Sequence, residues 1–521
     1  MASLPLRVVR RLRRVHHDAM HVRKLLHSRV HIEGAIEAVQ RRLPQRAEGF
    51  LDMVERTIFA HQRSPYKPLL EAAGYDFARI KALVAEDGLE GTLRRLCHDG
   101  AYVSIEEFKG IKEARRGGHT FHFDPDNFDN PLVQSGLWAS SGGTRSPGIP
   151  TTISFADHRM GIEDLAVALR AYDVLGRPAA VWVSSSSGVS VWGIAAIATL
   201  GTASSRWFTM LPERGRLSGL FDAVARFYGV TLPRLTDVPI GGESTVIEWT
   251  KQSEARYGCW VLTLPSFALR LALSAKRLRT DLANVTFITL GEPLTPAKLT
   301  AIRGVGARAF SSLGFTEFGR VTYGCTSPNS ADDGHICKDA VAVIQRRRAV
   351  DHMGTEVDAL LFTALWPHAR KILLNMETGD YATMTSRRCG CPLEALGWTD
   401  HLEEIRSFEK LNAVGRTFWG SGLYSLVEEV LPARFGGEPT DYQLVEEEDQ
   451  QGFTRLSALV HPRLGPVDEK AIVECIEETL HAVDRVQAAV WQESEVVRIR
   501  RASPMLTKAG KFMPLHHLRT A

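Results

Sequence analysis

The sequence predicts an α/β protein with a large multi-sheet N-terminal domain and a small α+β C-terminal domain. Between residues 150 and 380, short apolar runs such as 179–183 and 285–291 alternate with helical stretches. Runs of this length bounded by Gly or Pro are typical of buried strands in an α/β sheet. At 521 residues the chain is also too long for one ordinary core, so more than one domain is expected.

Residues 1–46 are expected to form a basic amphipathic extension. They contain 11 Lys or Arg against 3 Asp or Glu, and Leu6, Val9, Leu12 and Val15 recur at helical spacing. Three interpretations remain open: a helix that is solvated or packed on the protein itself, a contact with an anionic membrane or a partner protein, and a nucleic-acid-binding arm. The segment lacks the apolar core of a secretory signal, so export is not expected.

The predicted large domain, residues 47–404, begins with helices and continues through a long loop region. Helices are expected up to about residue 100, starting with one that places Phe50, Val54 and Ile58 on a single face. Between residues 118 and 150 the composition changes to Gly, Ser, Pro, Asp and Asn, which predicts a loop region with strand fragments. Long loops in compact domains are commonly functional.

The remaining residues, 405–521, are expected to fold as a small domain. The sequences RLSALVH and EVVRIR alternate apolar and polar residues, as strands do, and the helix expected between them places Ile472, Cys475, Ile476 and Leu480 on one face. A cleft between the two domains is where a ligand is expected to bind.

The composition predicts a cytoplasmic globular protein. Hydrophobic residues make up 44% and charged residues 24%, and no run of 18 uncharged apolar residues is present, so no membrane-spanning segment is expected. Seven cysteines, an odd number, without a secretory signal favour reduced thiols.

Several common catalytic motifs are absent from the sequence. Gly510 and Lys511 are followed by Phe512, so there is no Walker-type nucleotide loop. The sequence GVGARA at 304–309 matches a dinucleotide-binding fingerprint by letters, but a predicted helix precedes it where that fingerprint needs a strand. The G-x-S-x-G and H-E-x-x-H motifs are missing, which argues against a hydrolase triad and a zinc protease.

An ordered set of short motifs remains. It consists of ASSGGTRSP (139–147), LGEPL (290–294), LGFTE (313–317), TGD (378–380) and TKAGK (507–511). Small hydroxyl and glycine residues let backbone N–H groups approach a polyphosphate closely, so the first motif suits phosphate binding. Taken alone, it is equally well explained as a flexible turn.

In order and spacing, these motifs resemble those of the adenylate-forming superfamily of acyl-CoA and aryl-CoA ligases, most closely its phenylacetate-CoA ligase-like branch. The segments SPYKPLLEAAGYD (64–76) and TLPSFALRLA (263–272) extend the resemblance, which covers roughly residues 48 to 521. It implies an adenylation domain closed by a small lid domain, with ATP, Mg²⁺ and CoA as substrates and cofactor.

The resemblance also implies a role for individual residues. Lys511 would complete adenylation, Glu317 would hold Mg²⁺ beside Thr316, and Asp380 would bind the ribose hydroxyls. The nucleotide-binding residues implied are Ser140, Ser141, Gly142, Gly143, Thr144, Arg145, Gly291, Glu292, Pro293, Gly314 and Asp380.

The sequence departs from the family pattern at several positions. In the phosphate loop, Gly143 stands where Thr is usual and Arg145 where Gly is usual, so Arg145 either clamps phosphate or marks an altered substrate. Leu313 replaces the aromatic residue that stacks on adenine. The hinge between the domains is matched only loosely by residues 409–422.

Four metal-binding side chains cluster in the second half of the large domain. Cys325, His335, Cys389 and Cys391 would form a Cys₃His structural zinc site, with Cys337 as a spare ligand. Some members of the phenylacetate-CoA ligase-like branch look as though they carry such a site. The alternative is a set of unlinked reduced thiols.

The expected function is AMP-forming activation of a carboxylic acid, followed by transfer to the CoA thiol. Two alternatives remain: transfer to a carrier-protein thiol, a protein thiol or an amine, and a nucleotide-binding protein that has lost catalysis. The resemblance implies that the acyl pocket lies near segment 191–201 and beside the turn at 263–267. This lining is mostly small and apolar, with Trp192 as one bulky wall, and it favours an uncharged aromatic or medium aliphatic acid. The expected partners are the acid, a carrier protein and a second copy in a homodimer, with no nucleic acid.

Overall fold

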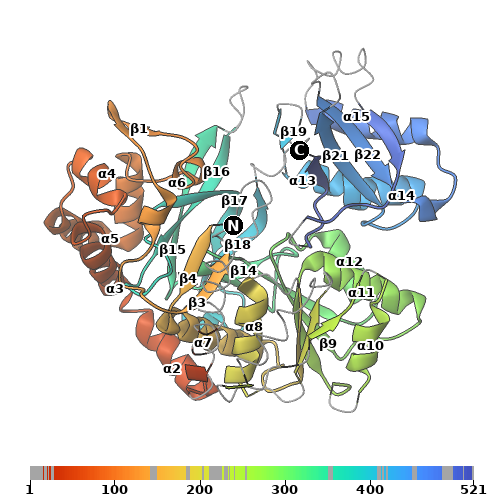
Figure 1. Cartoon of the computed structure of the whole chain (residues 1–521), viewed down its shortest axis with the longest axis horizontal. Coiled ribbons are helices and arrows are strands. Elements are labelled where there is room, and N and C mark those ends of the chain that lie inside the picture. The colour runs from red at the N-terminus through yellow and green to blue at the C-terminus, as the bar shows by residue number, and fades with distance from the viewer. Residues whose placement is uncertain are drawn as a thin grey trace, which may run out of the picture.

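The computed structural model has the predicted α/β architecture, with a large multi-sheet part and a small C-terminal α+β part (Figure 1). The structure describes residues 16, 20, 23–24, 28–140, 149–183, 188–201, 205–209, 226–227, 233, 235–239, 241–252, 255–349, 356–407, 412–413, 416–417, 420–448, 454–483, 497–507 and 510–518.

A six-stranded parallel sheet with the order β10-β9-β8-β5-β6-β7 forms the centre of the large part. The predicted runs 179–183 and 285–291 are confirmed as two of its strands. Its members are β5 (Ala179–Trp182), β6 (Arg206–Thr209), β7 (Leu235–Asp237), β8 (Cys259–Thr263), β9 (Val285–Leu290) and β10 (Arg308–Ser312). Every residue of β5 and β8 is buried, which is why these strands read as continuous apolar runs rather than alternating ones.

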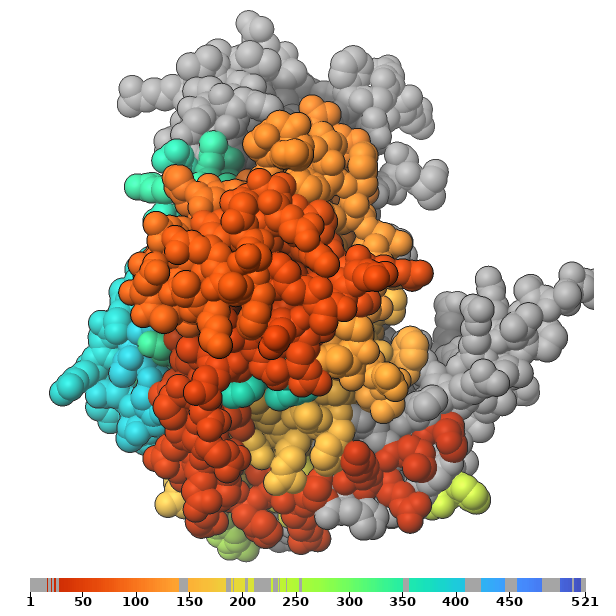
Figure 2. Space-filling view, turned by 90° about the vertical axis from the view of Figure 1, so that its left-hand side faces the viewer, coloured from red at the N-terminus to blue at the C-terminus, as the bar shows by residue number. Residues whose placement is uncertain are grey.

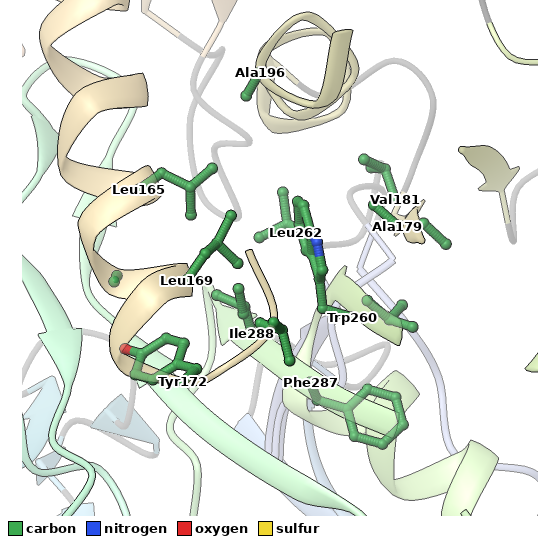
Figure 3. Close-up of a cluster of buried hydrophobic side chains, with 14 of the residues drawn as sticks. Leu165, Leu169, Tyr172, Ala179, Val181, Ala196, Trp260, Leu262, Phe287 and Ile288 are labelled. Atoms are coloured by element: carbon green, nitrogen blue, oxygen red, sulfur yellow. The ribbon is translucent and has the colours of Figure 1, made fainter. Parts of the chain in front are cut away.

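Helices connect these strands and cover the sheet. They are α7 (Phe155–Ala171), α8 (Gly188–Thr199), α10 (Ser244–Thr250), α11 (Pro265–Arg277) and α12 (Pro296–Arg303). Figure 3 shows Leu165 and Leu169 of α7, and Tyr172 directly after this helix, beside Leu262 and Ile288 of the sheet. Because α12 ends directly before residues 304–309, the GVGARA sequence follows a helix, as predicted.

A second, antiparallel sheet of six strands has the order β13-β14-β18-β17-β16-β15. Its strands are β13 (Thr322–Gly324), β14 (Gly334–Ile336), β15 (Val341–Ala349), β16 (Glu356–Ala364), β17 (Met376–Ser386) and β18 (Asp400–Ser407). The strand β18 spans the boundary predicted at residue 405. Beside this sheet, the short hairpin β11 (Gly314–Phe315) and β12 (Gly319–Arg320) carries the LGFTE motif.

The helices before residue 110 pack on the antiparallel sheet, where Phe50, Ile58 and Leu70 share a core with Ile344 and Leu361. Figure 2 shows these helices covering one face of the molecule. They are α3 (Arg46–Met53), the π-helix η1 (Val54–Phe59), α4 (Tyr66–Ala72), α5 (Phe77–His98) and α6 (Ile105–Phe108). The elements that follow are β1 (Ala114–Arg116), β2 (His119–Phe121), η2 (Pro125–Phe128), β3 (Leu137–Ser140) and β4 (Pro150–Ile153).

The end of the predicted basic extension belongs to the core of the large part. Helix α2 (Ile32–Arg42) buries Ala35 and Val39 in the same cluster as α7. Arg42 donates to Glu163 at 2.6 Å, to Asp164 at 2.5 Å and to Asp339 at 2.8 Å. The amphipathic repeat at Leu6, Val9, Leu12 and Val15 lies outside the described residues.

The C-terminal part contains a mixed sheet with the order β23-β22-β21-β24. Ile472, Cys475 and Ile476 of α15 face this sheet, as the helical spacing predicts, whereas the side chain of Leu480 lies outside the described residues. The elements are β21 (Tyr442–Glu448), β22 (Thr454–Val460), α15 (Glu469–Val483), β23 (Val497–Arg501) and β24 (Leu515–Leu518). Before them come β19 (Asn412–Ala413), β20 (Arg416–Thr417), α13 (Gly420–Ser425), the π-helix η4 (Leu426–Val430) and α14 (Leu431–Phe435). Among the helices that the structure describes, none is both long and apolar enough to cross a bilayer.

Candidate active site

A cavity of about 430 Å³ lies where the parallel strands end and the C-terminal part docks. Ile288 and Leu290 of β9 and Ser312 of β10 line it from the sheet, and Tyr424 and Lys511 line it from the C-terminal part. Clefts at the carboxyl ends of parallel strands are the usual ligand sites of open α/β sheets. The cavity combines an apolar wall with a small number of charged groups.

Lys511 reaches the cavity from the segment before β24. A Cβ atom on Gly291 would lie 3.4 Å from Cε and 3.5 Å from Nζ of Lys511, so the lysine side chain packs close to the backbone of Gly291. Gly291 has a φ of +81°, which favours glycine at this position. The turn before Lys511 is closed by a hydrogen bond of 3.0 Å from its backbone N–H to Thr507 Oγ1.

Glu292 connects the two parts of the molecule. Its carboxylate accepts hydrogen bonds from the backbone N–H of Ser266 at 3.0 Å, from Ser266 Oγ at 2.9 Å and from the backbone N–H of Phe512 at 2.8 Å. Burial raises the pKa of Glu292, while Lys298 and these donors act in the opposite direction. Glu292 and Pro293 line the cavity as expected, but both oxygens of Glu292 already have protein donors.

The β11–β12 hairpin brings the LGFTE motif to the cavity. Leu313, Gly314, Thr316 and Glu317 all line it, so Leu313 occupies the wall where the family pattern has an aromatic side chain. A Cβ atom on Gly314 would lie 2.7 Å from the carbonyl oxygen of Gly319, and only glycine fits the hairpin there. The pairing of Gly314 and Phe315 with β12 therefore positions the predicted motif at the cavity.

Asp380 approaches the cavity from β17, and Thr378 Oγ1 donates to its Oδ2 at 3.0 Å. The neighbouring strand β18 adds Arg406, which sequence reasoning missed. Arg406 donates to Asp332 at 2.8 Å, and both side chains line the cavity. Arg406 is one of four charged residues in β18, so in the sequence it resembles an ordinary solvent-facing position, and only the fold reveals its place at the cavity.

A buried ion pair fastens the C-terminal part beside the cavity. Lys298 Nζ of α12 lies 2.8 Å from Glu428 of η4, and each side chain is only 1% exposed. Thr295 Oγ1 donates to the same carboxylate at 2.5 Å. Sequence reasoning missed this pair, because residues 130 positions apart leave no local pattern.

The predicted phosphate loop is described only at its start. Ser140 ends strand β3, and its predecessor Ala139 lines the cavity. The remaining predicted loop residues, Ser141, Gly142, Gly143, Thr144 and Arg145, lie outside the described residues.

An ionic network that sequence reasoning did not predict lies behind the LGFTE hairpin. Arg320 bonds through Nε to Asp164 and lies 3.6 Å from Asp157. Arg370 donates to Asp157 at 2.8 Å and to the carbonyl oxygen of Thr316 at 3.0 Å. Burial would raise the pKa of Asp157, but Arg370 and Arg320 outweigh it and lower that pKa.

The predicted metal-binding side chains form a cluster away from the cavity. One ligand atom from each of Cys325, His335, Cys389 and Cys391 lies within 4.8 Å of the others. His335 Nδ1 is 2.6 Å from the carbonyl oxygen of Trp398, which leaves Nε2 facing Cys389 Sγ at 3.7 Å. The predicted spare, Cys337, is buried but is not a member of this group among the described residues.

Backbone N–H groups donate to the sulfur atoms of this cluster. Ser327 N lies 3.3 Å from Cys325 Sγ, and Cys391 N lies 3.4 Å from Cys389 Sγ. Hydrogen bonds, the strongest from Cys325, lower the pKa of the Cys391 thiol. The cluster is therefore suited to hold at least one thiolate.

No family model matches the chain, and no curated protein matches it. Several solved structures are similar at low identity. One is the McyG A-PCP protein complexed with phenylalanyl-adenylate, 11% identical over 93% of this chain and 95% of that chain, with a TM-score of 0.42. A second is the anthranilate CoA ligase AuaEII with anthranoyl-AMP, 13% identical over 72% and 65%, with a TM-score of 0.40. A third, an acyl-CoA synthetase (AMP-forming)/AMP-acid ligase II-like protein from Dyadobacter fermentans, is 12% identical over 72% and 86%, with a TM-score of 0.30.

Proposed function

We propose that this chain activates a carboxylic acid with ATP, releasing pyrophosphate, and passes the acyl group from the resulting acyl-adenylate to the thiol of CoA. The observation that carries the proposal is that Glu317, Asp380 and Lys511 line one cavity. They come from a hairpin, a strand of the antiparallel sheet and the C-terminal part, and in sequence they follow the order of the adenylate-forming ligases. We further propose a place in the phenylacetate-CoA ligase-like branch.

In the first half-reaction, a carboxylate oxygen of the acid attacks the α-phosphorus of ATP and the bond to pyrophosphate breaks. The ammonium group of Lys511 would face the negative charge that develops on the α-phosphate, as preorganised electrostatic catalysis requires. Asp380 would accept hydrogen bonds from the ribose hydroxyls. The phosphate loop, residues 140–145, would donate backbone N–H groups to the triphosphate.

Glu317 is the residue that would hold Mg²⁺. Hard cations prefer carboxylate oxygens, and Glu317 offers them in a cavity that Asp380 and Asp332 also line, so the donor chemistry fits. The ion, when bound, neutralises charge on the phosphates of the nucleotide. Arg406, which donates to Asp332 and lines the same cavity, would add a fixed cation there.

We also propose that the Cys₃His cluster binds a structural zinc ion. A tetrahedral site with Zn–S bonds of 2.3 Å places its ligand atoms roughly 3.8 Å apart, so the present separations, all within 4.8 Å, need only a small contraction. The hydrogen bond from His335 to Trp398 is the kind of outer contact that orients a metal-bound imidazole. The site would tie β14 to the segment after β17.

Pyrophosphate exchange tests the proposed function. Purified protein is incubated with ATP, labelled pyrophosphate and a panel of aryl and medium aliphatic acids, with and without CoA. Acid-dependent exchange is expected, together with an acyl-CoA product. Exchange without a CoA product would direct attention to a carrier-protein thiol, a protein thiol or an amine as acceptor. A complete absence of exchange would favour a nucleotide-binding protein that has lost catalysis.

A further inference from the structure

Two buried hydrogen-bond donors lie together at the apolar wall of the cavity. They are the indole N–H of Trp192 and the guanidinium of Arg320, and both side chains line the cavity. Within the described part of the chain, neither Trp192 Nε1 nor Arg320 Nη2 has a hydrogen-bond partner. Leaving a buried donor without a partner destabilises a protein. Two such donors in a ligand cavity therefore indicate that the ligand supplies the hydrogen-bond acceptor.

Gly161 of α7 shows that the two side chains approach one place in the cavity wall. A carbon atom at its Cβ position would lie 3.5 Å from Arg320 Nη1 and 3.7 Å from Trp192 Nε1, so this shared point lies between the two side chains. Because Gly161, Trp192 and Arg320 all line the cavity, a ligand in the cavity can approach both side chains in front of Gly161.

The guanidinium of Arg320 is fixed from behind by carboxylates, and its side chain is only 7% exposed. Its Nε donates to Asp164 and its Nη1 lies 3.6 Å from Asp157, which leaves Nη2 for another partner. The connected network contains four arginines and four carboxylates: Arg42, Arg159, Arg320 and Arg370 with Asp157, Glu163, Asp164 and Asp339.

This balance of charge decides which kind of acceptor fits. A second carboxylate on the substrate would bring an uncompensated negative charge into a buried site, which is costly. A hydroxyl or carbonyl oxygen satisfies both donors without changing the charge. The apolar residues of this wall would contact the hydrocarbon part of the acyl group; they are Leu165, Val183, Val189 and Leu262.

We propose that Trp192 and Arg320 form a subsite for a neutral oxygen on the acyl group of the substrate. The substrate class is then a hydroxy- or oxo-substituted carboxylic acid rather than a plain hydrocarbon acid. This inference rests on the proposed function and specifies its substrate. Trp192 and Arg320 act as specificity-determining residues that contact the acyl group away from the reacting carboxylate.

The test compares acids that differ by one oxygen: 4-hydroxyphenylacetate against phenylacetate, and 8-hydroxyoctanoate against octanoate. Two readouts are used, kcat/KM in pyrophosphate exchange and calorimetric binding of the acid without ATP. The parent protein is expected to prefer one oxygenated acid over its partner by about tenfold or more, since a site built for a hydrogen bond rejects a ligand that lacks it.

Two substitutions probe the donors without opening the ionic network. Trp192→Phe removes the N–H group and keeps an aromatic ring, so it should lower activity toward the oxygenated acid more than toward the unsubstituted acid and remove most of the preference. Gly161→Ala places a methyl group at the shared point at ordinary contact distances, so the fold should persist while the preference is lost. Gly34→Ala on α2, where nothing lies within 4 Å of the new carbon, is the matched control.

The two readouts separate this inference from the proposed function. If exchange occurs with no preference for the oxygenated acids, or if Trp192→Phe lowers both members of a pair equally, the subsite is overturned and the function stands. If no acid supports exchange but the oxygenated acids bind more tightly in a Trp192-dependent way, the function is overturned and the subsite stands. Absence of preferential binding in both pairs overturns the subsite in either case.

Discussion

Glu292 accepts a hydrogen bond of 2.8 Å from the backbone N–H of Phe512, the residue next to Lys511. A buried carboxylate of the large part thus fixes the chain position of a lysine that belongs to the C-terminal part. The same carboxylate holds Ser266 at the start of α11. The placement of Lys511 in the cavity therefore depends on a side chain that need not react.

Substitution of Lys511 should abolish the first half-reaction selectively. Removing one preorganised charge typically costs on the order of 3 kcal/mol, so Lys511→Ala is expected to slow pyrophosphate exchange by about 10²-fold or more. Lys470→Ala, on the exposed face of α15, removes a lysine of the same domain and should leave exchange unchanged. Exchange that survives Lys511→Ala undiminished would contradict the role given to this residue.

Substitution of Glu292 should act through Lys511. Glu292→Gln keeps the shape but replaces one accepting oxygen with an NH₂ group, so one of the three donors loses its acceptor. We expect exchange to fall by roughly tenfold through kcat, with the KM for the acid little changed, because a buried hydrogen bond to a charged group contributes about 1.5–3 kcal/mol. A rise in KM alone, with kcat intact, would instead indicate a direct contact with substrate. Glu474→Gln on α15 is the control.

Zinc should be present and should stabilise the fold. Metal analysis of the purified protein is expected to find about one zinc per chain, and chelation should lower Tm because a ligand bound only by the folded state adds stability. Cys389→Ser should lose the metal. Cys475→Ser, which alters a buried thiol of the C-terminal part, should keep it. Less than a tenth of an equivalent of zinc in the parent protein would refute the site.

The contribution of Asp157 should depend on pH. Arg370 and Arg320 hold its pKa below the ordinary value of 3.8 in the folded state, so the unfolded chain binds the proton more readily. The stabilisation is therefore fully present above about pH 4 and is lost as the pH falls through the folded-state pKa.

This dependence is measured by comparing Tm of Asp157→Asn with the parent protein. At neutral pH the substitution leaves two buried arginines short of a partner and should cost about 3–5 kcal/mol. The difference in Tm should shrink as the pH is lowered from 5 toward 3. Asp52→Asn, at an exposed pair with Arg56, should show little difference at any pH. A difference for Asp157→Asn that stays constant across this range would contradict the assignment.

Local patterns in the sequence were sufficient to predict several elements. The strand at 179–182 is wholly buried, and the strand at 285–290 is buried up to Leu290, so their apolar runs are easily recognised. The apolar face of α15 follows the helical repeat for the same reason. The gathering of Glu317, Asp380 and Lys511 at one cavity was expected from motif order alone.

The charged interior could not be predicted from the sequence. Arg320 pairs with Asp164, which lies 156 positions away in the sequence. Lys298 pairs with Glu428, which belongs to a helix of the C-terminal part. In a sequence, such residues resemble solvated charges, because ion pairs between distant segments have no periodicity. The unpartnered donors of Trp192 and Arg320 could be recognised only from the structure, because Trp192 and the LGFTE hairpin are far apart in the sequence but line the same cavity.

Arg42 limits how many residues can be removed from the N-terminus without disturbing the core. Judged by its charge, the beginning of the sequence is a removable tail, yet three carboxylates of later segments converge on Arg42. A truncated protein that starts near residue 28 would keep this arginine and the apolar face of α2. One that starts at residue 47 would leave Glu163, Asp164 and Asp339 facing one another across an opened core. An N-terminal truncation should therefore stop before α2, although α2 belongs to the predicted basic extension, residues 1–46.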